Sequence, residues 1–263
     1  MKNPLYKGYF LTQTSAIEGA ETQISSGNQK IYESNTWQLR QFSFLEYAKR
    51  GMITRHSSLP GFISDLSLKV DVIDFGSGSG WLGTLIMSQS QNKLGKYTGI
   101  ELSKNVTFFR QGLTHGNLQL ETYNNFLKNW IPKDTNLIFY SNSVMQYTSL
   151  EEIKSIINVT NPNYMIFDDL LMTEDDEFYT YQNYYGNDLV VHFRNINDLI
   201  SEIGSDRYEV IVMEDYPLTL DARFSYEIAN FEKMKLENPK TLVFSHVNNS
   251  KALAKDLKRV LPC

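Results

Sequence analysis

The chain has 263 residues, of which 41% are hydrophobic, 13% aromatic and 21% charged. This composition is typical of a folded protein with a substantial core, and the length suits one large α/β domain with a smaller addition. The net charge of −5 and the isoelectric point of about 5.5 argue against a surface that binds nucleic acid along its length. We therefore expect no nucleic-acid partner.

The cysteine content and the absence of targeting patterns indicate a reducing compartment. The single cysteine, Cys263, is the last residue of the sequence, so no disulfide can form within it. The opening MKNPLYKGYF lacks the apolar run of a signal peptide, and no segment has the roughly 18 consecutive apolar residues of a membrane helix. We expect a cytoplasmic protein that does not insert into a membrane.

Residues 1–66 are expected to form an N-terminal arm and a helical cap. Residues 1–31 are rich in Ser, Thr, Gln and Gly and show little periodicity, which predicts a loop-like arm. Apolar residues then recur at helical spacing behind a Ser/Asn cap, which predicts a helix over 34–50. The pair Pro60-Gly61 predicts a turn.

Residues 67–263 are expected to form a single α/β domain. Apolar strand-like runs alternate with helical runs, which is typical of a parallel sheet covered on both faces. The expected strands are 69–75, 96–101, 118–123, 135–144, 163–172, 207–215 and 240–247, and the expected helices are 80–91, 102–116, 149–159 and 195–204. Together they predict a Rossmann-like, doubly wound, mostly parallel seven-stranded sheet whose last strand is antiparallel, with the N-terminal arm or lid beside it.

A glycine-rich turn follows the first strand of this domain. Residues 76–80 read Gly-Ser-Gly-Ser-Gly directly after the apolar run VIDF. Ligands of an open parallel sheet bind outside the carboxyl ends of its strands, so this turn is a binding position. We therefore place Gly76, Ser77 and Gly78 in a cofactor site.

The spacing of the glycines argues against a dinucleotide. The pattern G-x-G-x-x-G is matched literally by Gly78, Gly80 and Gly83, but this register lies inside the helix and leaves Gly76 unexplained. In the register that starts at the strand end, the position that needs a small residue for close packing of helix on strand holds Trp81.

Two acidic residues favour a cofactor with a cationic end and a free ribose. Asp74 lies two residues before the turn, where a carboxylate repels a diphosphate but tolerates an ammonium and a sulfonium. It either faces the ligand or orders the turn. Glu101 ends the second strand and can accept hydrogen bonds from both ribose hydroxyls of an adenosine cofactor.

The segments VIDFGSGSG and YTGIELS resemble the first two motifs of the class I S-adenosylmethionine-dependent methyltransferases, and the resemblance extends over residues 70–247. It implies S-adenosyl-L-methionine as cofactor and S-adenosyl-L-homocysteine as product. LETYNNF resembles the third motif, which implies that Asn125 meets the adenine amine and Phe126 flanks the ring. NLIFYSNSVMQYTSLEE resembles the fourth, with Ser141 in the cofactor site, although Gln146 stands where a histidine is usual.

The remainder resembles a bacterial subgroup associated with surface-polysaccharide (capsule or O-antigen) loci, through EFYTYQNYYG, HFRNINDLISEIG and the closing strand pair. The resemblance implies methyl transfer to an oxygen of a small molecule, such as a carbohydrate or a phosphorylated precursor. Tyrosines can pack on a sugar face and supply a hydroxyl, so four of them are candidates for the acceptor wall. They are Tyr179, Tyr181, Tyr184 and Tyr185.

His192 and Asp168 are the candidates for a catalytic base. His192 follows the fifth strand, and Asp168 lies near the carboxyl end of that strand, where chemistry can occur. No histidine–carboxylate pair stands out, which favours an acceptor that needs little deprotonation. Arg40 is either a surface charge or a partner of the cofactor carboxylate.

A metal site is not expected. The segment TEDDEF, residues 173–178, is expected to be a solvated loop, because consecutive carboxylates alternate in direction. No spaced pair of His or Cys indicates zinc.

Two alternatives to a methyltransferase stay open. One is a nicotinamide-dependent oxidoreductase on the same sheet, and the other is a catalytically silent module that binds S-adenosylmethionine. The oligomeric state is left open.

Overall fold

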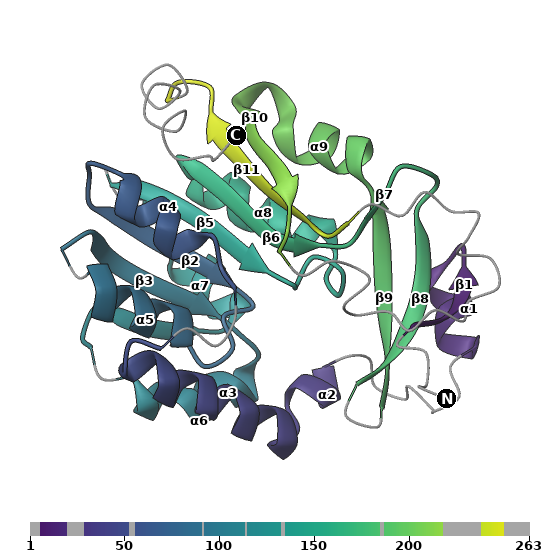
Figure 1. Ribbon diagram of the computed structural model, residues 1–263, viewed down its shortest axis with the longest axis horizontal. Helices are drawn as coiled ribbons and strands as arrows, with labels where there is room; N and C mark the ends of the chain where they lie inside the picture. The colour runs from purple at the N-terminus through teal and green to yellow at the C-terminus, as the bar shows by residue number, and fades with distance from the viewer. Residues whose placement is uncertain are drawn as a thin grey trace.

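The computed structural model describes residues 6–19, 29–52, 56–90, 92–113, 115–132, 135–184, 187–217 and 238–249 (Figure 1). Its main feature is a seven-stranded sheet in the order β10-β11-β6-β5-β2-β3-β4. The strands are β2 (Val70–Phe75), β3 (Leu94–Ile100), β4 (Leu118–Glu121), β5 (Asn136–Asn142), β6 (Tyr164–Leu170), β10 (Tyr208–Asp215) and β11 (Lys240–His246). β11 pairs antiparallel with β6 and β10, and all other pairs are parallel. The predicted fold class is therefore confirmed.

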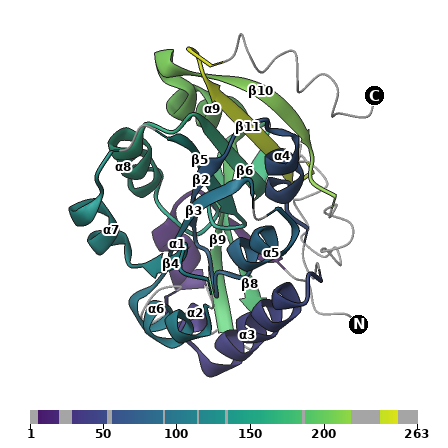
Figure 2. The ribbon, with the colours of Figure 1, turned by 90° about the vertical axis from the view of Figure 1, so that its left-hand side faces the viewer.

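Helices cover both faces of this sheet, which explains the nearly continuous apolar character of its central strands. One face packs against α3 (Asn35–Lys49), α4 (Leu59–Asp65) and α5 (Trp81–Ser90). The other packs against α7 (Tyr123–Asn129), α8 (Leu150–Thr160) and α9 (Ile196–Gly204). Figure 2 shows α4 and α5 on one side of the sheet and α7 and α8 on the other. No helix among the described residues is long and apolar enough to cross a membrane.

Several helix ends follow local sequence signals. Ser34 caps α3 by accepting a hydrogen bond from the amide of Trp37, at 3.3 Å. Ser149 and Glu152 form a capping box at the start of α8. The turn expected at Pro60-Gly61 is wrong, because both residues lie in the first turn of α4, where the missing amide hydrogen of proline costs nothing.

A second, smaller sheet stands beside the main one, to the right in Figure 1. Its order is β1-β8-β9-β7, and its strands are β1 (Tyr6–Phe10), β7 (Met172–Thr173), β8 (Phe178–Tyr184) and β9 (Asn187–Asn195). β8 pairs antiparallel with β9 and, on its other edge, with β1. The predicted loop-like arm is therefore wrong for β1, for α1 (Gln13–Gly19) and for α2 (Gln29–Tyr32). The pairing of β1 depends on an edge supplied more than 150 residues later, so local patterning does not reveal it.

The strand order of the main sheet reverses between β2 and β5. From β2 the chain crosses to β3 and β4 on one side, whereas β5 and β6 lie on the other. A doubly wound sheet opens a crevice at the carboxyl ends of such a strand pair. Here these ends carry the glycine turn after β2 and the connection from β5 to α8.

Candidate functional site

The glycine turn has a backbone that other residues adopt only with strain. Gly76, Gly78 and Gly80 have φ angles of 77°, 59° and 71°. A Cβ atom on Gly76 would collide with the side chain of Val144, and one on Gly78 would collide with the side chain of Gln41. The backbone of the turn therefore packs directly against the segment that connects β5 to α8 and against α3.

Glu101 lies directly against this turn. Its Oε2 accepts a hydrogen bond from the amide of Gly78 at 2.8 Å. Its Oε1 accepts from the amide of Leu102 at 2.9 Å and from Nδ2 of Asn105 at 3.1 Å. Burial raises the pKa of the Glu101 carboxyl, and these three donors act in the opposite direction. The structure therefore brings Gly78 and Glu101 together and fixes the orientation of the carboxylate.

A chain of buried amides supports Glu101 from behind. Gln38 of α3 donates through Nε2 to Oδ1 of Asn105 at 3.0 Å, and Asn105 also donates to the main-chain oxygen of Tyr32 at 3.0 Å. Both side chains are buried. Neither residue is part of a motif that the sequence reveals. The available signal is that Gln38 and Gln41 interrupt the apolar face of a helix, where buried polar groups need partners.

Three buried oxygens at the turn find no hydrogen-bond partner among the described residues. They are Oε1 of Gln41, Oγ of Ser77 and Oγ of Ser141. Ser141 lies beside Phe75 in the β2–β5 register, so it belongs to the strand end that faces the turn. Buried polar atoms nearly always have a hydrogen-bond partner, and one that no protein group satisfies is left for water or a ligand. These atoms therefore fit a polar ligand bound over the turn.

Asp74 points into the protein interior rather than toward this ligand position. It is 4% exposed and accepts a hydrogen bond from the hydroxyl of Tyr97. Burial, and then the Asp74 charge, raise the pKa of Tyr97 well above its usual range. Of the two roles expected for Asp74, the geometry favours ordering the strand end beneath the turn.

Of the three other predicted cofactor residues, Phe126 is placed differently from expectation, whereas Arg40 takes the first of its two expected roles, that of a surface charge. Phe126 is buried in the core with its ring 5.1 Å from that of Trp130, so it does not present an open face to a ligand. Asn125 is exposed and lines an open groove beside β4. Arg40 is exposed with its guanidinium 5.5 Å above the ring of Phe44, and the next residue along the helix, Gln41, faces the turn instead. Consecutive helical residues point about 100° apart, so only one of the two can face the site.

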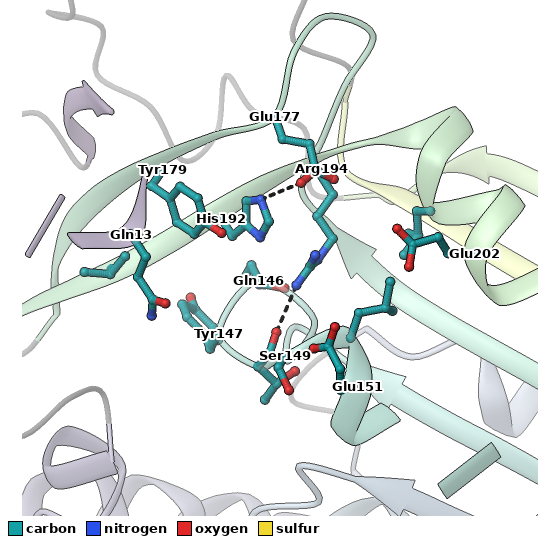
Figure 3. Close-up of a pocket in the computed structure, with 14 residues that line it drawn as sticks. Gln13, Gln146, Tyr147, Ser149, Glu151, Glu177, Tyr179, His192, Arg194 and Glu202 are labelled. Atoms are coloured by element: carbon teal, nitrogen blue, oxygen red, sulfur yellow. Dashed lines mark hydrogen bonds and ion pairs between the residues drawn. The ribbon is translucent and has the colours of Figure 1, made fainter. Parts of the chain in front are cut away.

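A cavity of about 380 Å³ opens beyond the β5–α8 connection (Figure 3). Its walls come from α1, from that connection, from α8 and α9, and from one face of the β8–β9 pair. The lining residues are Gln13, Gln146, Tyr147, Thr148, Ser149, Leu150, Glu151, Glu177, Tyr179, Val190, His192, Arg194, Leu199 and Glu202. One of the predicted wall tyrosines, Tyr179, lines it. Tyr181 is buried beside Phe10, and Tyr185 and the side chain of Tyr184 lie outside the described residues.

His192 is paired with a carboxylate in this cavity. Its Nε2 lies 3.0 Å from Oε2 of Glu177, and its ring stacks on Tyr179 with the centroids 4.1 Å apart. Burial lowers the pKa of His192, although Glu177 acts in the opposite direction, and the close contact with His192 lowers the pKa of Glu177. We therefore describe the pair as a neutral imidazole beside an ionised carboxylate.

This pair corrects two expectations. The sequence shows no histidine–carboxylate pair, but β8 and β9 place Tyr179 opposite His192 and so bring Glu177 within reach. Glu177 was expected to belong to a solvated loop. It is half-buried, whereas Glu174, Asp175 and Asp176 are exposed as predicted.

Asp168 lies in the core and not in the cavity. It is completely buried, and its carboxylate accepts hydrogen bonds from the amide of Ser58 at 2.8 Å, from the hydroxyl of Tyr140 at 2.8 Å and from Oγ1 of Thr241 at 2.8 Å. The hydroxyl of Ser58 donates as well, at 2.9 Å. Asp168 thus ties the start of α4 to β5 and β11, and the structure does not bring it to His192.

Comparisons with known proteins bear on the fold. No protein-family model matches the sequence, and no curated protein matches it. The structure is similar to the pyocyanin biosynthetic protein PhzM, at 10% identity and a TM-score of 0.52 over 86% of this chain and 63% of PhzM. It is also similar to the methyltransferase in a complex with the Haloferax volcanii Trm112 methyltransferase activator, at 10% identity and a TM-score of 0.50 over 84% of this chain and 98% of that one.

An S-adenosylmethionine-dependent methyltransferase from Listeria monocytogenes matches more loosely, at 13% identity and a TM-score of 0.47 over 72% of this chain and 99% of that one. At such identities the similarity describes the backbone and not the activity. The chain has the α/β, Rossmann-like fold of the class I methyltransferases.

Proposed function

We propose that the protein is an S-adenosyl-L-methionine-dependent methyltransferase that transfers a methyl group to an oxygen of a small molecule. The observation that carries the proposal is the contact between Gly78 and Glu101 at the reversal point of the strand order. This contact places the glycine turn and the carboxylate of Glu101 side by side at the position where a doubly wound sheet binds its ligand.

The residues at the turn fit this cofactor. Glu101 can accept hydrogen bonds from the ribose hydroxyls, and Gly76 and Gly78, whose added Cβ atoms would meet Val144 and Gln41, hold the turn beside that carboxylate in a left-handed backbone conformation. The unsatisfied oxygens of Gln41, Ser77 and Ser141 are acceptors for an ammonium group or for water. When bound, the cofactor supplies a methyl group on a cationic sulfur.

Trp81 supports this cofactor over a nicotinamide dinucleotide. Its ring is 7% exposed and packs 6.2 Å from the ring of Phe44, so a large side chain occupies the start of α5. A dinucleotide turn needs a small residue at this point for close packing of helix on strand. The one glycine inside α5, Gly83, instead faces the ring of Tyr97 on β3.

We also propose that the methyl acceptor is a polar molecule of the carbohydrate type, because the lining of the cavity suits one. The ring of Tyr179 offers an apolar face, and amide, hydroxyl and charged groups surround it. A sugar presents the same combination of apolar ring faces and hydroxyls. We further propose that the acceptor is a cytoplasmic precursor of a bacterial surface polysaccharide, on the sequence resemblance described above.

Isothermal titration calorimetry with S-adenosyl-L-homocysteine tests the proposal, with NAD⁺ as the comparison ligand. We expect saturable one-to-one binding of S-adenosyl-L-homocysteine and none of NAD⁺. Binding of NAD⁺ alone would establish the oxidoreductase alternative. Binding of S-adenosyl-L-homocysteine without methyl transfer to any cell-extract fraction would establish a catalytically silent module.

A further inference from the structure

The cavity is separated from the glycine turn by a single connection, residues 143–149. Val144 of this connection lies against Gly76, whereas Gln146 and Tyr147 line the cavity. The main-chain oxygen of Gln146 accepts a hydrogen bond from the amide of His192 at 3.0 Å. One short segment thus touches the proposed cofactor crevice on one side and the histidine on the other.

The cavity contains buried polar atoms that lack partners. Oε1 of Gln146 and Nε of Arg194 find no hydrogen-bond partner among the described residues, and their side chains are 4% and 9% exposed. Figure 3 shows both side chains directed into the cavity. One of these atoms is an acceptor and the other a donor, which are the two partners that a hydroxyl group needs. The cavity therefore offers an acceptor and a donor that a ligand hydroxyl group can bind.

The charges around the cavity disfavour an anionic ligand. Among the described residues that line the cavity, Arg194 alone has a permanent positive charge, and it lies among the carboxylates of Glu151, Glu177 and Glu202. Lys154 offsets Glu202 from outside, with Nζ 3.1 Å from Oε2. Carboxylates still outnumber cations, so a phosphate group placed here is repelled, whereas an uncharged molecule is not.

His192 is oriented as a base toward this space. Its Nε2 lies 3.0 Å from Oε2 of Glu177 without the geometry of a hydrogen bond, so the attraction of the carboxylate, and not a formed bond, favours the hydrogen of the neutral ring at Nε2 and the lone pair on Nδ1. Figure 3 shows the second ring nitrogen on the side of the ring away from Glu177. Among the described residues, the other charged or titratable groups that line the cavity are Tyr179 from β8, Arg194 from β9, Tyr147 from the connection, Glu151 from α8 and Glu202 from α9.

We propose that this cavity binds an uncharged, hydroxyl-bearing acceptor, and that His192 takes the hydroxyl proton while Glu177 positions its ring. This inference rests on the proposed function and narrows its acceptor to the uncharged class. The acceptor O–H proton moves to Nδ1 of His192, a bond forms between that oxygen and the methyl carbon, and the carbon–sulfur bond breaks with its electron pair on sulfur. The products are the methyl ether, S-adenosyl-L-homocysteine and a proton, which His192 returns to water. Glu177 is a positioning residue in this scheme.

The test uses the full-length protein with S-adenosyl-L-methionine labelled in its methyl group. Small-molecule extract of the source cells is divided by anion exchange into an uncharged fraction, a fraction of phosphorylated sugars and a fraction of nucleotide-linked sugars, and each is incubated with the enzyme. We expect label in the uncharged fraction. Label confined to either anionic fraction overturns the inference and leaves the proposed methyltransferase intact. Binding of S-adenosyl-L-homocysteine with label in no fraction overturns both and establishes the catalytically silent module. Failure to bind S-adenosyl-L-homocysteine overturns the proposed function itself.

Variants test the proton transfer with the labelled fraction as substrate. We expect His192→Gln to lower kcat by about 10²–10⁴-fold, which is the usual contribution of a general base, with unchanged binding of S-adenosyl-L-homocysteine. Glu177→Gln should lower kcat less than His192→Gln does. It should also move the acid limb of the pH–rate profile to lower pH, because the carboxylate of Glu177 raises the pKa of His192. His115→Gln, at an exposed position, is the matched control and should be unchanged. Wild-type kcat in His192→Gln, or an unshifted profile in Glu177→Gln, contradicts the assignment.

Discussion

The amide of Gly78 donates a 2.8 Å hydrogen bond to Oε2 of Glu101, which joins the turn after β2 to the end of β3. Neither residue is informative alone, because glycine turns and strand-end acids are both common. Their contact means that a ligand over the turn meets the carboxylate at the same time. The proposed cofactor site depends on this relationship.

Replacing Glu101 with alanine should weaken binding of S-adenosyl-L-homocysteine at least about tenfold, which corresponds to about 1.4 kcal/mol. The substitution removes the acceptor for the ribose hydroxyls. Calorimetry measures the dissociation constant, and circular dichroism checks the fold. Glu46→Ala, which removes an exposed partner of Lys49, should leave the affinity unchanged. Unchanged affinity in a folded Glu101→Ala protein would remove Glu101 from the site.

Gly78→Ala should destabilise the protein by about 1–2 kcal/mol, the cost of a left-handed conformation for a residue with a Cβ. The new methyl group also meets Gln41, so ligand binding should weaken. Gly61→Ala is the matched control, since no atom lies near its added Cβ and Gly61 is within α4. It should stabilise the protein by about 0.5–1 kcal/mol through helix propensity. Thermal unfolding measures the stability change of each variant. Equal melting temperatures for the two variants would show that the backbone of Gly78 is not strained by a Cβ atom.

Asp168→Asn should lower stability by about 1–3 kcal/mol, because the buried donors of Ser58, Tyr140 and Thr241 lose a charged acceptor. The activity of the folded fraction should be retained, since Asp168 does not line the cavity. Urea unfolding and methyl transfer measured on one preparation separate the two effects. The exposed Asp65→Asn serves as control. A large loss of kcat at full stability would restore the catalytic role that the sequence predicted.

The stability of the wild-type protein should fall with decreasing pH in a window that begins near pH 6.5 and ends at the lowered pKa of His192. Burial lowers this pKa in the folded state, so the unfolded chain binds more protons across the window and acid favours unfolding. His192→Gln lacks this contribution and should show a flatter dependence, whereas His115→Gln should follow the wild type. Chemical unfolding between pH 8 and pH 5 gives the comparison. Parallel curves for wild type and His192→Gln would show that His192 titrates normally.

The main sheet could be predicted because its signals are local. Apolar strands of four to eight residues alternate with helices, and a local pattern, the capping box of Ser149 and Glu152, marks the start of α8. The placement of Gly78 and Glu101 follows once the sheet is parallel, because adjacent strand ends meet at one edge. The burial of Phe126 could not be predicted from the strand order, because a residue in the first turn of the helix after a strand can face either the site or the core.

The sequence by itself determined the order of strands and helices and the glycine turn, since propensity, periodicity and backbone freedom are properties of neighbouring residues. Only the tertiary structure decided that β1 completes the small sheet, that Asp168 is an internal anchor and that Glu177 meets His192. Each of these outcomes depends on burial and on a hydrogen-bond partner from a distant part of the chain. Glu177 is half-buried beside His192 and not a fully exposed surface acid because of that partner, and no local pattern of residues encodes the contact.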